Sequence, residues 1–190
     1  MFTNNYIALK KQIFLSSYST YYKDVRGQSI QGYNCTLAYY DIGQWLHLAR
    51  CQSIKTTVTS GNPGNYPGVY FGSGSTPATK DDYTLESPIT SGLSITNPSA
   101  LTWVDNGNGK YTATASYVVQ NTTDAEINIY EIGVFSSVNT YYLGSSNNSS
   151  NQFFLVLMER TVLDVPIVIA PGEAKLVTYK VTFNQTLNVE

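Results

Sequence analysis

Few side chains in this chain have the chemistry of a nucleophile, a base or a metal ligand. His47 is the single histidine, so a Ser-His-Asp or Cys-His arrangement would have to use it. Cys51 follows four residues later, which would place both side chains on one face of a helix. A lone histidine beside Trp45 and Leu46 is more often packed than catalytic, and we therefore expect a structural His47.

Acidic residues form the second candidate group. Asp81 and Asp82 are adjacent, and a helical turn capped by Thr79 explains them better than a calcium site. Paired carboxylates for glycoside hydrolysis meet only in space, so one sequence does not reveal such a pair. The acids considered for it are Glu86, Glu126, Glu131, Glu159, Asp164 and Glu173.

Two of these acids lie inside apolar, strand-like sequence. A carboxylate there must face solvent or find a partner, and this applies to Glu131 and Glu159. Arg160 adjoins Glu159, and an Arg–Glu pair across a sheet is the simplest account. The sequence thus predicts structural acids.

Neither a phosphate loop nor a metal site is indicated. Gly72-Ser73-Gly74 lacks the Lys-Ser/Thr of a phosphate loop and the third glycine of a dinucleotide site, so it predicts a tight turn. Cys35 and Cys51 are too few for a disulfide framework or a zinc site and are interpreted as structural thiols. We expect no enzyme, no cofactor and no metal.

The bulk composition excludes several partners. The net charge is −2, which argues against nucleic-acid binding, and 13% of residues are charged where about 25% is usual. There is no run of 18 apolar residues to span a membrane, and Lys10 and Lys11 interrupt any signal-peptide core. We therefore expect synthesis in a cytoplasm without membrane association.

The region from Glu126 to Phe183 organises the fold. Apolar and polar residues alternate in LVTYKVTF and in YTATASYVV, as in strands with one buried face, and FFLVLM predicts a strand covered on both faces. Turn residues at Asp105–Gly109 and Ala170–Glu173 separate these runs. The pattern predicts a mainly β fold, an antiparallel β-sandwich of jelly-roll or immunoglobulin-like type with six or more short strands, over residues 67–190.

The N-terminal part, residues 1–66, combines a predicted helix with a Tyr-rich connecting block. Phe2, Tyr6, Leu9 and Ile13 recur at helical spacing within Thr3–Phe14, and this short helix must dock on its own sheet or on another subunit. The low charge and the 16 tyrosines favour a surface that contacts other protein. The competing interpretation is a solvent-exposed surface hydrated through its many Asn, Ser and Thr side chains. The predicted subunit contacts are Phe2, Tyr6, Leu9, Ile13, Tyr21, Tyr22, Tyr39 and Tyr40.

An alternative function is carbohydrate binding. Exposed aromatic rings stack on sugar faces, and β-sandwiches often carry such sites on a loop edge. The competing interpretation is that tyrosine packs well on sheets and at subunit contacts. The candidate stacking residues are Trp45, Tyr66, Trp103, Tyr141 and Tyr142.

Five patches in order along the chain resemble small virion-associated proteins of tailed bacteriophages. They are MFTNNYIALKKQIF, VYFGSGSTPATKDDYTLESPI, YTATASYVVQNTT, INIYEIGVF and ERTVLDVPIVIAPGEAKLVTYKV. None is a catalytic signature. The resemblance implies a structural part of a particle in the collar, tail, fibre attachment or capsid surface, contacting other virion proteins and copies of itself, with a host-surface glycan as a further possible partner. Residues 18–66 depart from this pattern.

Overall fold

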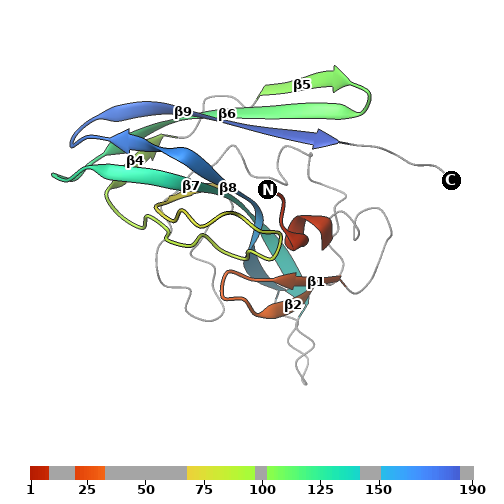
Figure 1. Cartoon of the computed structure of the whole chain (residues 1–190). Coiled ribbons are helices and arrows are strands. Elements are labelled where there is room, and N and C mark those ends of the chain that lie inside the picture. Colours follow the sequence, from red (N-terminus) through yellow and green to blue (C-terminus); the bar gives the residue numbers. More distant parts are fainter. Residues whose placement is uncertain (9–19, 33–67, 97–101, 142–150, 185–190) are drawn as a thin grey trace.

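In a computed structural model, the described residues form three antiparallel sheets and a short helix near the N-terminus (Figure 1). The three-stranded and four-stranded sheets pack face to face, and the third sheet is a two-stranded hairpin. The structure describes residues 1–8, 20–32, 68–96, 102–141 and 151–184. The predicted mainly β, antiparallel sandwich is therefore confirmed. The helix spans residues 4–8 and the strands are β1 Thr20–Lys23, β2 Ser29–Gly32, β3 Gly68–Gly72, β4 Leu93–Thr96, β5 Thr102–Gly107, β6 Lys110–Asn121, β7 Ile127–Tyr141, β8 Asn151–Ile169 and β9 Ala174–Asn184.

The two sheets share no strand. One has three strands in the order β3-β7-β8. The other is centred on β6, which pairs with β9 along almost its whole length. Because β9 occupies one edge of β6, β4 and β5 share the opposite edge, at Val118–Asn121 and Lys110–Thr114 respectively. All these pairs are antiparallel. A tight turn joins β5 to β6, whereas β3–β7, β4–β6 and β6–β9 pair strands that are not consecutive in the chain.

The sandwich core lies between the facing sides of the two sheets. Alternation in β6 buries Ala113, Ala115, Tyr117 and Val119, as the sequence predicts. Full burial of the Val119 side chain contributes roughly 1.5–3 kcal/mol, and the smaller alanine side chains contribute less. The rest of this core comes mainly from Val69, Phe71, Ile129, Ile132, Val134, Val156, Met158, Ile169, Val177, Tyr179 and Val181.

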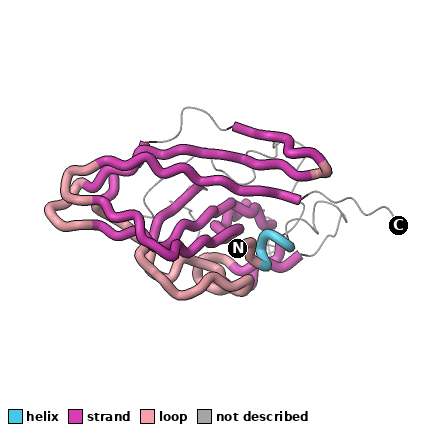
Figure 2. Tube along the Cα trace, turned by 45° about the horizontal axis from the view of Figure 1, so that its top comes forward, coloured by secondary structure: helices cyan, strands magenta, loops and turns pink. Residues whose placement is uncertain are grey.

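A second apolar cluster lies on the opposite face of the three-stranded sheet. It contains Tyr70, Leu85, Phe135, Leu155 and Leu157, with Val25 packed against it. Leu85 belongs to residues 73–90, which we call the strap, and the β1–β2 hairpin supplies Val25. The three-stranded sheet is thus covered on both faces, in agreement with the prediction for FFLVLM, and Figure 2 shows the loop segments alongside its strands.

The strands β7 and β8 are longer than the short strands predicted, with 15 and 19 residues. Pro166 does not end β8, because the register moves from Ile129↔Ile167 to Glu131↔Val162 and leaves Pro166 in an irregular stretch. A proline is tolerated there because the sheet requires no backbone N–H donor at an irregular position.

Sequence reasoning did not foresee the β1–β2 hairpin. Its turn is held by Asp24, whose carboxylate accepts hydrogen bonds from the N–H groups of Arg26 and Gln28, and Gly27 has a φ of 76°. The predicted helix over Thr3–Phe14 is observed for residues 4–8, and residues 9–19 lie outside the described part. The helical face considered for His47 and Cys51 and the boundary at residue 66 lie outside it as well.

Candidate functional site

The most concentrated polar chemistry in the described residues is a buried charge cluster on the strap side of the three-stranded sheet. Glu131 of β7 is 0% exposed and Arg160 of β8 is 3% exposed. Val134 lies opposite Glu159 whereas Phe135 lies opposite Leu157, so β8 carries one extra residue at this point. This bulge reverses the alternation of β8 and turns Arg160 to the face that holds Glu131.

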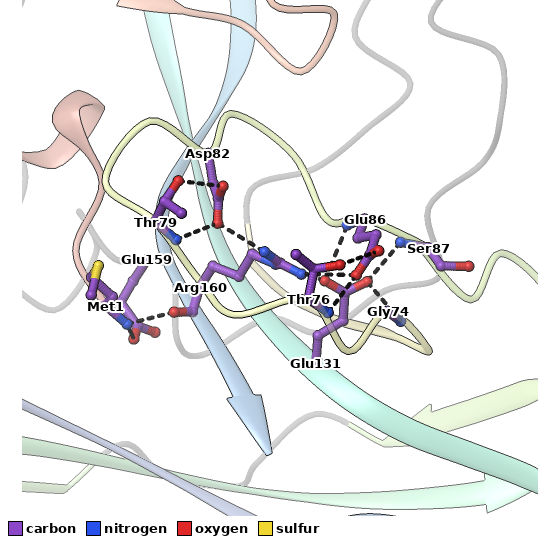
Figure 3. A network of polar contacts seen from close by, with 10 residues as sticks. All are labelled: Met1, Gly74, Thr76, Thr79, Asp82, Glu86, Ser87, Glu131, Glu159 and Arg160. Atoms are coloured by element: carbon purple, nitrogen blue, oxygen red, sulfur yellow. Dashed lines mark hydrogen bonds and ion pairs between the residues drawn. The ribbon is translucent and has the colours of Figure 1, made fainter. Parts of the chain in front are cut away.

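Glu131 uses both of its carboxylate oxygens (Figure 3). Its Oε1 accepts hydrogen bonds from the N–H groups of Gly74 at 3.2 Å and Ser87 at 2.8 Å. Its Oε2 accepts one from the N–H of Glu86 at 3.1 Å and one from Arg160 Nε at 2.8 Å. A carboxylate has about four acceptor positions, so these donors saturate it. Three of the four come from the strap, and Glu131 therefore acts as a clamp on that segment.

Arg160 binds two further carboxylates of the strap. Its Nη1 donates to Asp82 Oδ2 at 2.8 Å, and its Nη2 lies 3.4 Å from Glu86 Oε2. Burial lowers the pKa of Arg160, but hydrogen bonds to Asp82 and Glu131 outweigh it and raise that pKa above its ordinary value. The guanidinium is thus a permanent charge that joins β8, β7 and the strap.

The two strap carboxylates are held in their ionised forms. Burial raises the pKa of Asp82, but hydrogen bonds from Arg160 and Thr79 outweigh it and hold the pKa below its ordinary value. Hydrogen bonds from the hydroxyl and N–H of Thr76 lower the pKa of Glu86, with a smaller contribution from the charge of Arg160. Neither acid has the raised pKa that a general acid needs near neutral pH.

Local bonds within the strap shape it around the cluster. The N–H and hydroxyl of Thr79 donate to the carboxylate of Asp82 at 2.9 and 2.8 Å. The structure forms a turn there, not the predicted helical turn. The predicted cap is therefore wrong, because Thr79 donates these hydrogen bonds and Asp82 accepts them. Asp81 accepts a hydrogen bond from Asn4 Nδ2 at 2.7 Å.

The predicted tight turn at Gly72-Ser73-Gly74 is wrong. Gly72 ends β3, and the next three residues form no turn. A Cβ at Gly72 would collide with Oε1 of Glu131, and one at Gly74 would lie 2.5 Å from Cβ of Glu86. The two glycines are required by the close approach of the backbone to the buried carboxylates.

Glu159, the other acid noted in the sequence, lies apart from this cluster. Its Oε1 is 2.7 Å from the amino group of Met1 and accepts a hydrogen bond from the Thr161 hydroxyl at 2.8 Å. The predicted Arg–Glu pair across the sheet is confirmed, with Glu131 and not the adjacent Glu159 as the partner of Arg160.

The remaining candidate acids do not converge with these. Glu126 accepts a hydrogen bond from Asn128, Glu173 lies 3.5 Å from Lys175, and Asp164 is exposed on β8. No group of three or more His, Cys, Asp or Glu side chains suited to a metal ion occurs within the described ranges.

The predicted subunit contacts fall into three groups. Tyr22 is 1% exposed and belongs to the sandwich core, so its assignment to a subunit contact is corrected. Phe2 and Tyr6 stack with their ring centroids 4.1 Å apart and pack partly against the chain's own core, while Tyr21 is 64% exposed. The predicted contacts outside the described residues are Leu9, Ile13, Tyr39 and Tyr40.

The candidate sugar-stacking residues remain predictions. Trp103 lies in β5 in register with Ala113, and Tyr141 is the last residue of β7, but their side chains lie outside the description. Residues entirely outside it are Trp45, Tyr66 and Tyr142, together with His47, Cys35 and Cys51.

Comparison with known proteins adds no relative. No protein-family model, curated protein or solved structure matches this chain. Within the described residues, no helix has the length and apolar character needed to cross a bilayer.

Proposed function

We propose that this chain is a non-enzymatic structural component of a tailed-phage virion, which acts by assembly with other virion proteins and with copies of itself. The observation that carries the proposal is the outer face of the four-stranded sheet. Its positions are Ser94, Thr96, Thr102, Val104, Lys110, Thr112, Thr114, Ser116, Val118, Gln120, Ala174, Leu176, Thr178, Lys180 and Thr182. Two lysines are the only charged residues among them.

An apolar pair lies on this face, near the end of β6 and the start of β9. Val118 and Leu176 are directly opposite each other in the register of β6 and β9, and they are 44% and 69% exposed. Depletion of charge around an apolar centre is typical of protein interfaces. The pair therefore favours a surface that is covered by protein in an assembly.

The polar residues of this face are suited to losing water. The hydroxyls of Thr112 and Thr182 are 3.1 Å apart, and those of Ser116 and Thr178 are 3.0 Å apart. Each pair satisfies a hydrogen bond across the two strands. Covering such hydroxyls costs less free energy than covering unpaired ones.

The charge cluster supports a structural role in the same protein. The carboxylate oxygens of Glu131, Asp82 and Glu86 accept hydrogen bonds from donors that are fixed in the fold. Glu131 therefore has no free acceptor position for a substrate proton. The virion as the location of this protein is proposed from the five ordered patches that resemble virion-associated proteins.

Sedimentation velocity of the purified chain tests the assembly surface. We expect self-association at micromolar concentration, and we expect Leu176→Asp to shift the chain to monomer. Val165→Asp is the matched control, because Val165 is also a strongly exposed aliphatic residue, at 77%, but lies on β8. A parent chain that stays monomeric, or a Leu176→Asp variant that associates as the parent does, would contradict the proposal.

A further inference from the structure

The strap and the sandwich are stabilised by different interactions. The sandwich is held by the core between two sheets, whereas residues 73–90 are attached largely through charged and hydrogen-bonded groups. We infer that the strap is an acid-labile cover: it lifts from the three-stranded sheet when its carboxylates lose their charge, while the sandwich stays folded, and its release exposes the second apolar cluster.

The apolar attachment of the strap is small. Leu85 is its one large side chain that is fully buried, and it lies over Gly133, where a Cβ would come within 2.7 Å of Leu85 Cδ2. Backbone hydrogen bonds attach it at two further points, from the N–H of Ile89 to the carbonyl of Phe71 and from the N–H of Asn4 to the carbonyl of Lys80, whereas the bond from Ser73 to Ser87 lies within the strap. Segments with few buried apolar contacts are the ones that open locally at a low free-energy cost.

Opening the strap over residues 73–87 leaves the main core covered, because Ile89, the strap residue that packs against that core, lies beyond this part. Tyr70, Phe135, Leu155 and Leu157 form the cluster beneath the strap, and none of them belongs to the sandwich core. Their side chains lie on the strap side of β3, β7 and β8, and the sandwich core lies on the other side of these strands. The rings of Tyr70 and Phe135 contact each other edge to face, with their centroids 5.2 Å apart. A lifted strap therefore exposes an aromatic and aliphatic surface on a sheet that remains paired.

Glu131 makes the attachment depend on charge. Its three hydrogen bonds to strap N–H groups are strong because the acceptor is an ionised carboxylate. An uncharged group with a donor in place of one oxygen would face the N–H groups that the carboxylate binds. Arg160 holds the strap through Asp82 and Glu86.

Of the charged groups on the hairpin, Lys23 lies beside the strap, at Tyr83. Lys23 of the hairpin lies 5.9 Å from the ring centroid of Tyr83, and Asp24 pairs with Arg26. The charged groups on the elements packed against the cluster are Lys80, Asp81, Asp82 and Glu86 of the strap, Glu131 of β7, Glu159 and Arg160 of β8, the amino group of Met1, and Lys23, Asp24 and Arg26 of the hairpin.

The pKa shifts give the direction of the pH effect. The pKa values of Asp82 and Glu86 are lowered in the folded state, so each stabilises the attached strap above its ordinary pKa of about 4. That stabilisation is lost as the pH falls through the lowered values. The strap is therefore expected to open below about pH 4.

Limited digestion with pepsin, which is active in acid, tests the inference directly. We expect cleavage inside residues 73–90, mapped by mass spectrometry, at a pH where the far-UV strand signal is still that of pH 7. We also expect increased fluorescence of a hydrophobic dye over the same pH range. A single transition, in which strap cleavage and loss of the strand signal share one midpoint, would overturn the inference.

A variant pair tests the role of the clamp at neutral pH. Glu131→Gln replaces one acceptor oxygen by a donor, and we expect its strap to be cut by chymotrypsin at least tenfold faster than that of the parent. Glu126→Gln, an exposed change in the segment preceding β7, is the control and should match the parent. Equal cleavage of Glu131→Gln and the parent would count against the clamp, and the acid series decides the matter if Glu131→Gln does not fold.

Discussion

Arg160 and Glu131 face each other across β7 and β8, with Arg160 Nε 2.8 Å from Glu131 Oε2, because β8 carries an extra residue at Met158. Without that bulge, Arg160 would point into the apolar core between the sheets. A one-residue irregularity thus brings the guanidinium to the carboxylate and, through them, fixes residues 73–90 to the sheet.

Removing the charge of Arg160 should destabilise the fold strongly. Arg160→Met leaves Glu131 buried with an uncompensated charge, and we expect a loss of about 3–5 kcal/mol in the free energy of unfolding. Urea denaturation followed by circular dichroism measures it. Arg26→Met, which removes a more exposed pair with Asp24 inside the hairpin, should cost about 1 kcal/mol or less. Equal losses in the two variants would show that the buried pair is unimportant.

A methyl group added at Gly72 should be harmful. Gly72→Ala places a Cβ against Oε1 of Glu131, and we expect a loss of about 1–3 kcal/mol from the forced displacement. Ser73→Ala, at the next, exposed position, is the control and should stay within about 0.5 kcal/mol. Thermal denaturation of both variants distinguishes them, and a Gly72→Ala protein as stable as the parent would rule out the close approach.

The pH dependence of stability should depend on Asp82. Because its pKa is lowered on folding, ionised Asp82 stabilises the native state above an ordinary pKa of about 4, and this contribution disappears as the pH falls through the lowered value. Asp82→Asn should therefore flatten the fall in melting temperature between pH 5 and pH 2.5. Identical slopes for Asp82→Asn and the parent would contradict the assignment.

Adjacent tyrosines in β1 should respond in opposite ways. Tyr22 is buried in the sandwich core, so Tyr22→Ala should cost about 3–5 kcal/mol. Tyr21 is 64% exposed, and Tyr21→Ala should leave the free energy of unfolding within about 0.5 kcal/mol. Chemical denaturation measures both. Similar effects of the two substitutions would indicate that β1 does not pack as described.

Much of the fold could be predicted from alternation and turn residues. The row from Ala113 to Val119 and the row from Val177 to Val181 are buried as their period of two requires, while Tyr111 is half-buried. The Asp105–Gly109 hairpin also follows from its residues, since Asn108 has a φ of 53° and its glycine neighbours are likewise positive. Local chemistry determined these features, so they were visible in the sequence.

The charge cluster could be predicted only in part. Acids inside apolar strands signalled buried partners, and this signal identified Glu131. Its actual partner depends on the bulge at Met158 and on the path of the strap, which brings Asp82 and Glu86 to Arg160 over long sequence separations. No local pattern encodes such a register shift.

The virion assignment is tested most directly by quantitative mass spectrometry of phage particles purified through a density gradient from cultures that express this gene. The account predicts that peptides of this chain co-purify with the particles in a fixed molar ratio to the other virion proteins. Absence from purified particles, with the chain abundant in the surrounding lysate, would contradict it.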